Sequence, residues 1–355
     1  MAPPQTLQAP LLTLTTLLGQ CRLALQQSRT AAAAAGPEPG PDPLALLHDA
    51  ATLAKAHTTR LAVSLSPPIT LDAAAQFMGE LSASAVPALA AGAGALAGGA
   101  QGAALGREAV RAVDALLRAL EELCAHVGTD SSRLVDTGVV WKAADRVAAL
   151  RARGLAGVVD GAVLVAADMV DDTWAELKEW VDNEDLDGSD SEEDEDMAEQ
   201  GFWDRPTRKG RIDETTRAHA EGALKKIKLV TILFGAARKR RLGGDGVLGD
   251  VARLDRMASL ADVISATTDD IGMAFFDDEE LEFAVSRAAV LCDAGADWRN
   301  RTMRGTCWWG RRPSLRSCAC SIAMARRINT RPGSRRARRR WRNLHDTTTS
   351  KQFEQ

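Results

Sequence analysis

Apolar residues recur every three or four positions over much of this chain, and the clearest pattern lies between residues 155 and 181. This spacing places the apolar residues on one side of an α-helix and the charged residues on the other. At 1.5 Å per residue, the helix would be about 40 Å long, a length typical of helical bundles. The recurring positions are Leu155, Val159, Ala162/Val163, Ala166, Met169/Val170, Thr173/Trp174, Leu177 and Trp180/Val181.

A shorter amphipathic pattern occupies residues 139–153, and Gly154 separates it from the long helix. We therefore predict a helical hairpin over residues 139–181. Weaker patterns predict further helices, which proline and glycine clusters separate. They cover residues 7–35, 44–65, 107–127, 213–241, 247–273 and 279–293, together with a helix that begins at Thr70 and is bent or ended by Pro87.

Composition supports an all-α class, because the chain has no Tyr and only 7 Phe, so aromatic β-strand patterns are scarce. A length of 355 residues suits two domains. Residues 92–106 are rich in Ala and Gly, and we interpret them as a linker.

We predict five parts: an N-terminal helix with a Pro/Gly linker (1–42), an N-terminal helical bundle (43–182), an acidic disordered linker (183–210), a C-terminal helical bundle (211–298) and an irregular, disordered basic tail (299–355).

Charge is distributed very unevenly along the chain. Residues 299–355 contain 15 Arg and one Lys against two acidic residues, a net charge of +14, so the rest of the chain carries −18. Residues 182–199 hold 11 Asp or Glu, a density that repels itself and predicts disorder. Ser189 and Ser191 each precede an acidic residue by three positions, as in sites of acidophilic kinases. This segment is either a solvated spacer or a regulated binding segment.

The sequence lacks the usual motifs of metal sites, phosphate-binding loops and catalytic nucleophiles. The five histidines have no helical partner at i+3 or i+4, and Cys318-x-Cys320 has the wrong spacing for zinc, so we predict no metal site. No glycine cluster has a phosphate-loop pattern, and no nucleophile motif is present, so we predict no cofactor and no enzymatic activity. No uninterrupted apolar window is long enough to span a membrane, and no secretory leader opens the chain. We expect a reducing compartment, cytosol or nucleus.

Two basic clusters leave alternatives open. Arg238, Lys239, Arg240 and Arg241 form either a nuclear-import signal or the cationic end of a helix, which the helix dipole favours. The second cluster, residues 335–342, lies in the basic tail beside Trp341 and would contact nucleic-acid phosphates. The tail also has the composition expected from translation of GC-rich DNA in a shifted frame or through a retained intron.

Several stretches in consistent order, from about residue 44 to residue 298, resemble the cyclin-D-binding protein family, also called Grap-and-cyclin-D-interacting proteins. Two positions depart from the family pattern. Phe275-Phe276-Asp277-Asp278 replaces an aromatic-Pro-Pro sequence, and the closing helix of the family is missing near Arg299. The stretches that carry the resemblance are 58–63 leading to Pro67-Pro68, 137–145, 171–177, the acidic linker, 254–256, 264–265 and 269–271.

The resemblance implies a non-enzymatic, all-helical protein that binds D-type cyclins and helix-loop-helix proteins, restrains the cell cycle and occurs in nucleus and cytoplasm. It also implies that Trp141 is a core residue and that Asp269-Asp270 is the acidic pair of the family. The charged side of the long helix is then the surface to test for partners. Its acidic residues are Asp168, Asp171, Asp172, Glu176 and Glu179. An alternative function is nucleic-acid binding through the Arg-rich tail. The sequence does not identify the partner, and it does not indicate whether the chain forms a homo-oligomer.

Overall fold

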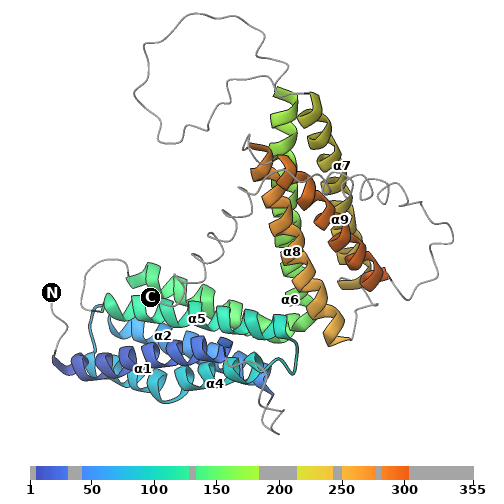
Figure 1. Cartoon of the computed structure of the whole chain (residues 1–355). Coiled ribbons are helices and arrows are strands. Elements are labelled where there is room, and N and C mark those ends of the chain that lie inside the picture. The colour runs from blue at the N-terminus through green and yellow to red at the C-terminus, as the bar shows by residue number, and fades with distance from the viewer. Residues whose placement is uncertain are drawn as a thin grey trace, which may run out of the picture.

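The computed structural model describes residues 5–30, 42–127, 133–183, 214–242, 250–276 and 281–303. These residues contain helices and no strand, so the prediction of an all-α fold is confirmed. The helices form two bundles that meet at a corner (Figure 1). They are α1 (Gln5–Thr30), α2 (Pro43–Ser64), α3 (Leu71–Glu80), η1 (Leu81–Ala85), α4 (Val86–Ala97), α5 (Ala103–Ala125), α6 (Arg133–Asn183), α7 (Glu214–Ala237), η3 (Arg238–Leu242), α8 (Val251–Phe276) and α9 (Leu281–Met303).

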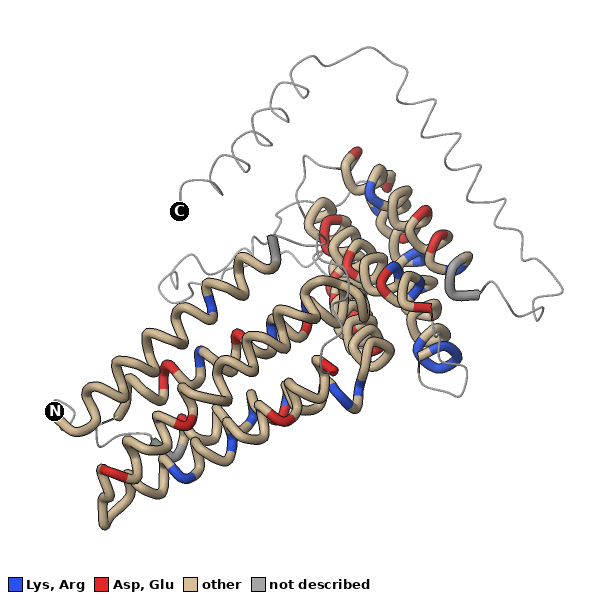
Figure 2. Tube along the Cα trace, turned by 90° about the horizontal axis from the view of Figure 1, so that it is seen from below, with Lys and Arg blue, Asp and Glu red and all other residues tan. Residues whose placement is uncertain are grey.

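The first bundle consists of α1 to α5 and the first half of α6, residues 133–153. Its core is built from one apolar stripe of each helix, such as Leu7, Leu14, Leu18 and Leu25 of α1. Helix α1 carries little charge (Figure 2). Arg22 is the one charged residue among its described side chains, and it is partly buried. Its guanidinium pairs with Asp114 and Glu121 of α5 at 3.1 and 2.5 Å, which ties α1 to the bundle.

Pro87 does not end the long helical segment from Leu71 to Ala97. Because proline has no N–H and its ring crowds the preceding turn, the helix widens into the π-helical turn η1 just before it. The hydroxyls of Ser82 and Ser84 donate to the carbonyls of Met78 and Glu80, which satisfies acceptors around this turn.

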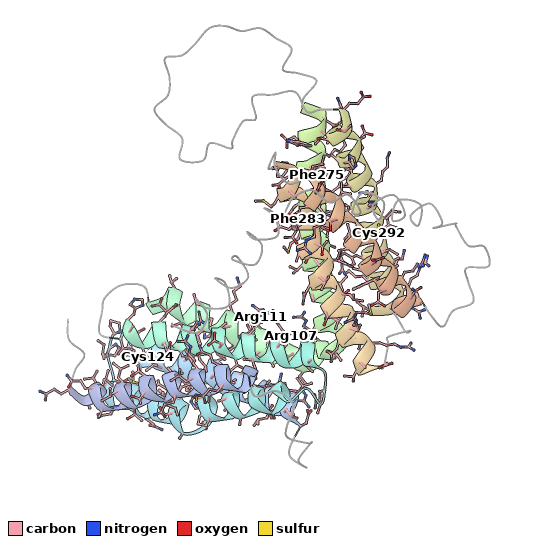
Figure 3. The ribbon with its side chains drawn as sticks, in the orientation of Figure 1. Arg107, Arg111, Cys124, Phe275, Phe283 and Cys292 are labelled. Carbon is pink, nitrogen blue, oxygen red and sulfur yellow. The ribbon has the colours of Figure 1, made fainter. Side chains whose placement is uncertain are left out.

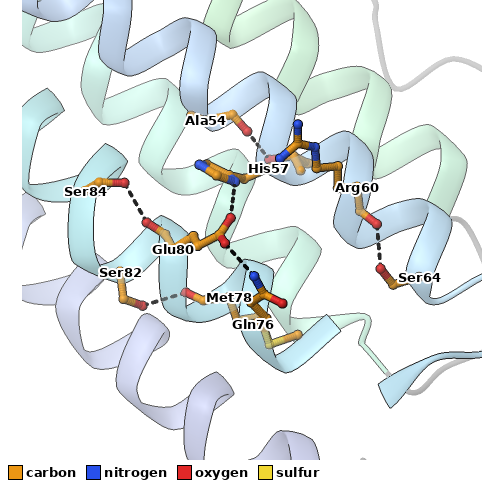
Figure 4. Close-up of polar contacts among 10 residues, drawn as sticks. Ala54, His57, Arg60, Ser64, Gln76, Met78, Glu80, Ser82 and Ser84 are labelled. Carbon is orange, nitrogen blue, oxygen red and sulfur yellow. Dashed lines mark hydrogen bonds and ion pairs between the residues drawn. The ribbon is translucent and has the colours of Figure 1, made fainter. Parts of the chain in front are cut away.

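The carboxylate of Glu80 fastens the same turn to α2. Its Oε2 lies 2.9 Å from Nδ1 of the buried His57, and its Oε1 accepts a 2.9 Å hydrogen bond from Gln76 (Figure 4). The π-helical turn and its polar contacts therefore help to hold α3 and α4 on α2.

The interpretation of residues 92–106 as a linker is wrong, since only residues 98–102 lie outside α4 and α5. The small residues of this segment allow neighbouring helices to pack closely. A Cβ added at Gly92 would come within 2.9 Å of the Leu47 side chain in α2, and one at Gly106 would meet the carbonyl oxygen of Leu96. Alanine and glycine in this segment therefore let α4 approach α2 and α5.

The segment Leu71–Ala97 is also long and apolar enough to cross a membrane by length and composition. Most of its large apolar side chains are buried in the bundle, while Leu71 and Phe77 are half-buried. The buried ones include Leu81, Val86, Leu89 and Leu96, each at most 2% exposed.

Helix α6 turns a corner at Gly154, whose φ of 54° and ψ of −168° break the helical path. The first half runs along α5, and the second half, residues 155–183, turns away to join α7, α8 and α9 (Figure 1). The predicted hairpin is therefore wrong, because the two segments do not fold back on each other. The two hydrophobic cores divide near Gly154, whereas we predicted that the N-terminal bundle would extend to residue 182.

The second bundle comprises the second half of α6 with α7, α8 and α9, which closes a four-helix arrangement. Its largest buried side chains are Phe234 of α7 and Trp298 of α9, which pack edge to face with ring centroids 5.0 Å apart. Figure 3 shows Phe275 and Phe283 in this bundle and Cys124 in the first. The predicted basic tail begins inside α9, and its residues 304–355 lie outside the described part of the chain, as do residues 184–210 of the predicted linker.

Asp255 of α8 joins the two bundles at the corner. Its carboxylate accepts hydrogen bonds of 2.8 Å from the backbone N–H groups of Ala103 and Ala104 at the start of α5. These N–H groups have no partner within their own helix, so a residue 151 positions away serves as the N-cap. Gly102 makes the approach possible, because its φ is +111° and an added Cβ would collide with Leu155.

We predict that Asp255→Ala destabilises the corner by about 0.5–2 kcal/mol, the usual cost of losing an N-cap. Hydrogen exchange should accelerate at the amides of Ala103 and Ala104. Asp262→Ala removes an exposed carboxylate of the same helix and should leave these amides unchanged. Equal exchange rates of these two amides in both variants would contradict the role of Asp255 as the N-cap of α5.

We also predict that Gly106→Ala destabilises the chain by roughly 1–3 kcal/mol, because the added methyl group must push α4 and α5 apart. The matched control is Gly138→Ala in α6, where an added Cβ has open space. That variant should be stabilised by up to ~1 kcal/mol, since alanine favours a helix over glycine. Chemical denaturation followed by circular dichroism measures both changes in the free energy of unfolding. A destabilised Gly138→Ala with an unaffected Gly106→Ala would contradict the close packing at Gly106.

Candidate functional site

The predicted acidic residues all lie on the exposed side of the second half of α6. Val159, Val163, Val170 and Leu177 bury the opposite side in the core. Helical spacing therefore separates the carboxylates from the core, as the sequence pattern indicates. The exposed residues are Asp168, Asp171, Asp172, Glu176 and Glu179.

Contacts divide four of these five carboxylates, all but Glu179, into two groups. Asp171 accepts a 3.0 Å hydrogen bond from the hydroxyl of Thr231, so it lies at the border with α7. Asp168 lies on the same side, where its charge helps to raise the pKa of Arg238. Asp172 and Glu176 make no ion pair or hydrogen bond within the described residues. These two are the carboxylates most available to a partner.

Helix α8 extends the acidic surface, and the sequence pattern did not indicate this. It runs beside the second half of α6 in the same direction, with Asp255 near Leu155 at one end and Phe276 near Trp180 at the other (Figure 1). Its exposed carboxylates include Asp262 and Asp269. Two exposed helices therefore present acidic side chains on one side of the second bundle.

The acidic pair that the family resemblance singled out is split by the fold. Asp270 pairs with Arg287 of α9 at 2.9 Å and thus serves the packing of α8 on α9. Its neighbour Asp269 is exposed and makes no ion pair or hydrogen bond within the described residues. Asp269 is therefore available at the surface, whereas Asp270 helps to hold α8 on α9.

Exposed apolar side chains accompany the carboxylates on both helices. On α6, Val165 and Met169 are 60% and 45% exposed, and on α8 Met273 and Phe276 are 65% and 37% exposed. Large apolar side chains at the surface that are framed by polar groups mark interaction sites. We call this surface the acidic face and define it by Val165, Met169, Asp172, Glu176, Asp262, Asp269, Met273 and Phe276.

Basic side chains on these two segments are already paired with acids of their own. The carboxylate of Asp182 holds Lys178, that of Asp250 holds Arg253, and that of Asp297 holds Arg256. The acidic face therefore has a negative potential that these neighbouring cations do not cancel.

Two half-buried aromatic residues of α6 contact the neighbouring helices. Trp180 is half-buried and contacts Phe275 and Phe276, with ring centroids 6.2 and 6.0 Å apart. Trp174 is half-buried under the ammonium group of Lys228 at 4.8 Å. These contacts fix α6 against α8 and α7.

The prediction that Trp141 is a core residue is wrong. Its side chain is 39% exposed, while Val140, Ala144 and Val147 fill the core on the neighbouring side of the helix. One residue corresponds to about 100° of rotation on a helix, so Trp141 is turned away from the side on which Val140, Ala144 and Val147 lie.

The basic cluster at the end of α7 is divided in the same way as the acidic pair. Arg238 forms a two-pronged ion pair with Asp160 of α6 at 2.8 and 3.2 Å, and this hydrogen bonding raises the pKa of Arg238. Lys239 and Arg240 are exposed. An import role for Arg238, Lys239, Arg240 and Arg241 stays a prediction. The predicted phosphorylation sites Ser189 and Ser191 lie outside the described residues.

Within the described ranges, no three His, Cys, Asp or Glu side chains gather closely enough to hold a metal ion. The geometry of the acidic face offers carboxylates and apolar groups in a row along two helices. Such a surface is chemically suited to bind a cationic, partly apolar segment of another protein.

Comparison with known proteins agrees with the resemblance seen in the sequence. An uncharacterized protein of Schizosaccharomyces pombe is 27% identical over 217 residues, a match that covers 56% of this chain and 62% of that protein. The chain thus matches less than two thirds of this relative. Residues 46–183 match the family model described as Grap2 and cyclin-D-interacting, N-terminal. Over residues 46–183, this chain is therefore similar to the N-terminal domain of the Grap2 and cyclin-D-interacting family.

Proposed function

We propose that this chain is a non-enzymatic interaction protein and that the acidic face of α6 and α8 receives its partner. The observation that carries the proposal is the combination, on two adjacent helices, of exposed Val165, Met169, Met273 and Phe276 with carboxylates that are not neutralised. Exposed apolar residues that cluster, rather than lie singly, are typical of an interaction surface.

The partner best suited to this face is an amphipathic helix with Lys or Arg beside its apolar stripe. Apolar side chains at the centre supply affinity when they leave water, and charges around them steer the encounter and fix its orientation. The face extends from Val165 to Glu176, about three helical turns, which matches three or four anchors spaced at i, i+3 or i+4 and i+7.

The family description supports a cyclin of the D type as the partner, and the resemblance extends this to helix-loop-helix proteins. Binding of either would restrain cell-cycle progression or transcription by occupying a surface that the partner needs elsewhere. We accordingly propose that the chain acts in both nucleus and cytoplasm.

Two of the three described cysteines, Cys21 and Cys124, lack the properties of a catalytic thiol. Burial raises the pKa of the Cys124 thiol to about 12, so it carries almost no thiolate at neutral pH. Burial also raises the pKa of Cys21. Neither thiol is activated as a nucleophile.

The proposal predicts that Asp172→Lys/Glu176→Lys/Asp269→Lys weakens binding of a purified D-type cyclin by about 10-fold or more, because three attractive charges become repulsive. The matched control is Asp49→Lys/Glu122→Lys/Asp293→Lys, which changes three exposed carboxylates outside the acidic face. Calorimetric titration of the full chain measures both affinities.

Circular dichroism should show the same helix content in both triple variants, since all six positions are exposed. Wild-type binding should also weaken as salt is raised, because the attraction between exposed charges is screened. Unchanged affinity in the first triple variant, or an equal loss in both, would remove the acidic face from the mechanism.

A further inference from the structure

Helix α7 presents an outer stripe of the opposite sign to the acidic face. On its inner side, Ile227, Val230 and Phe234 are buried. The outer side carries Leu229 and Ile232, which are 55% and 59% exposed, among exposed cations. We call this surface the basic stripe and define it by Lys225, Lys228, Leu229, Ile232, Lys239 and Arg240.

Helical geometry places these residues together. Within α7, positions 225, 229, 232 and 236 are spaced by three or four residues, so they lie on one line along the helix, and Lys239 and Arg240 follow in the π-helical turn η3. Lys228 and Lys239 flank this line, and Lys228 is held in place over the ring of Trp174. The stripe is therefore about four turns long, with two apolar side chains near its centre.

The positive charge of the stripe is largely uncompensated. Within the described residues, no ion pair reaches Lys225, Lys239 or Arg240, whereas Arg238 beside them is bound to Asp160. Glu221 is the one exposed acid on α7 after its first turn. A cationic, partly apolar stripe thus stands on a body that carries a net charge of −18 outside the basic tail.

The basic stripe and the acidic face belong to separate corners of the second bundle. Helix α7 packs mainly on α6 and α9, and so does α8, so α7 and α8 lie at opposite corners. A partner bound along α7 therefore leaves the α8 part of the acidic face uncovered.

We infer that the basic stripe is a second docking surface, for an acidic amphipathic segment of another protein whose apolar residues cover Leu229 and Ile232. Carboxylates of that segment would pair with Lys225, Lys239 and Arg240. The chain would then hold two partners of opposite charge at once. This inference goes beyond the proposed function and does not depend on it.

An acidic protein segment fits the stripe better than other anionic ligands do. Nucleic-acid backbones are contacted mainly through charged and polar groups, which would leave two large apolar side chains without a role. Helices that lie in a membrane surface bury a broad apolar side, whereas this stripe offers two large apolar residues. Only a partner with both carboxylates and apolar side chains uses the whole stripe.

The test uses the full chain and a fluorescein-labelled synthetic helical peptide with Glu at its polar positions and Leu at i, i+3 and i+7. Fluorescence anisotropy should show binding. Lys225→Glu/Lys239→Glu should raise the Kd by about 10-fold or more, because two attractive charges are reversed. Leu229→Ser/Ile232→Ser should also raise the Kd by roughly 10-fold, since the peptide leucines lose their apolar partners.

The matched control is Lys142→Glu/Arg151→Glu, which reverses two exposed cations on the first half of α6 and changes the net charge equally. Its Kd should stay within about 2-fold of the wild type at physiological salt, because charges far from the stripe are screened. The variant Asp172→Lys/Glu176→Lys/Asp269→Lys should bind the peptide at least as well as the wild type, which separates this result from the test of the acidic face.

Three results would overturn the inference. The first is peptide binding that neither stripe variant weakens, which would place the anionic site elsewhere, such as in the basic tail. The second is an equal loss in the stripe variant and in Lys142→Glu/Arg151→Glu. The third is no peptide binding, together with binding of duplex DNA or of vesicles containing phosphatidylserine that the stripe variant abolishes.

Discussion

The left-handed backbone of Gly154 lets one 51-residue helix, α6, serve two hydrophobic cores. A φ of 54° is costly for residues that carry a Cβ, and here it turns the chain between Leu150, which is buried in the first core, and Val159, which is buried in the second. Asp255 then fixes the corner by capping α5 from the other bundle. The two bundles are coupled by this backbone turn and by this cap.

This coupling means that the region matched by the family model, residues 46–183, does not end at the boundary between the two bundles. Its last helical segment, residues 155–183, buries its apolar side against α7, α8 and α9, which lie beyond the matched range. The matched domain therefore needs the helices that follow it to cover Val163, Val170 and Leu177. The same arrangement places the acidic face on α6 and α8 together, so a surface that begins within the family domain is completed outside it.

The helices and their buried sides were predictable from local patterns. Pro43 after Asp42 marks the start of α2, and the apolar spacing of α6 separates buried from exposed residues correctly along most of its length. The pattern does not say which helix covers a stripe, so the division of α6 between two cores was missed. Residues 92–106 were missed because alanine and glycine give little contrast between sides, although close packing against Leu47 requires them to be small.

The candidate site was predictable only in part, for the same reason. The five carboxylates of α6 could be assigned to an exposed side, but the engagement of Asp171 by Thr231 depends on a residue 60 positions away. Met273 and Phe276 belong to the acidic face because α8 lies beside α6, which no spacing within α8 indicates. Trp141 shows the opposite error, since a large aromatic residue next to a buried position need not itself be buried.

Hydrogen exchange on the full chain carrying Phe234→Ala tests the division of α6 most directly. Loss of this buried ring should weaken the second core by about 3–5 kcal/mol. The amides of residues 159–181 should then lose protection together with those of α7, α8 and α9, while residues 139–153 keep the protection of the first bundle. Loss of protection over residues 139–181 as one unit would contradict the division of α6. Unchanged protection of residues 159–181 while α7 and α9 lose theirs would contradict it as well.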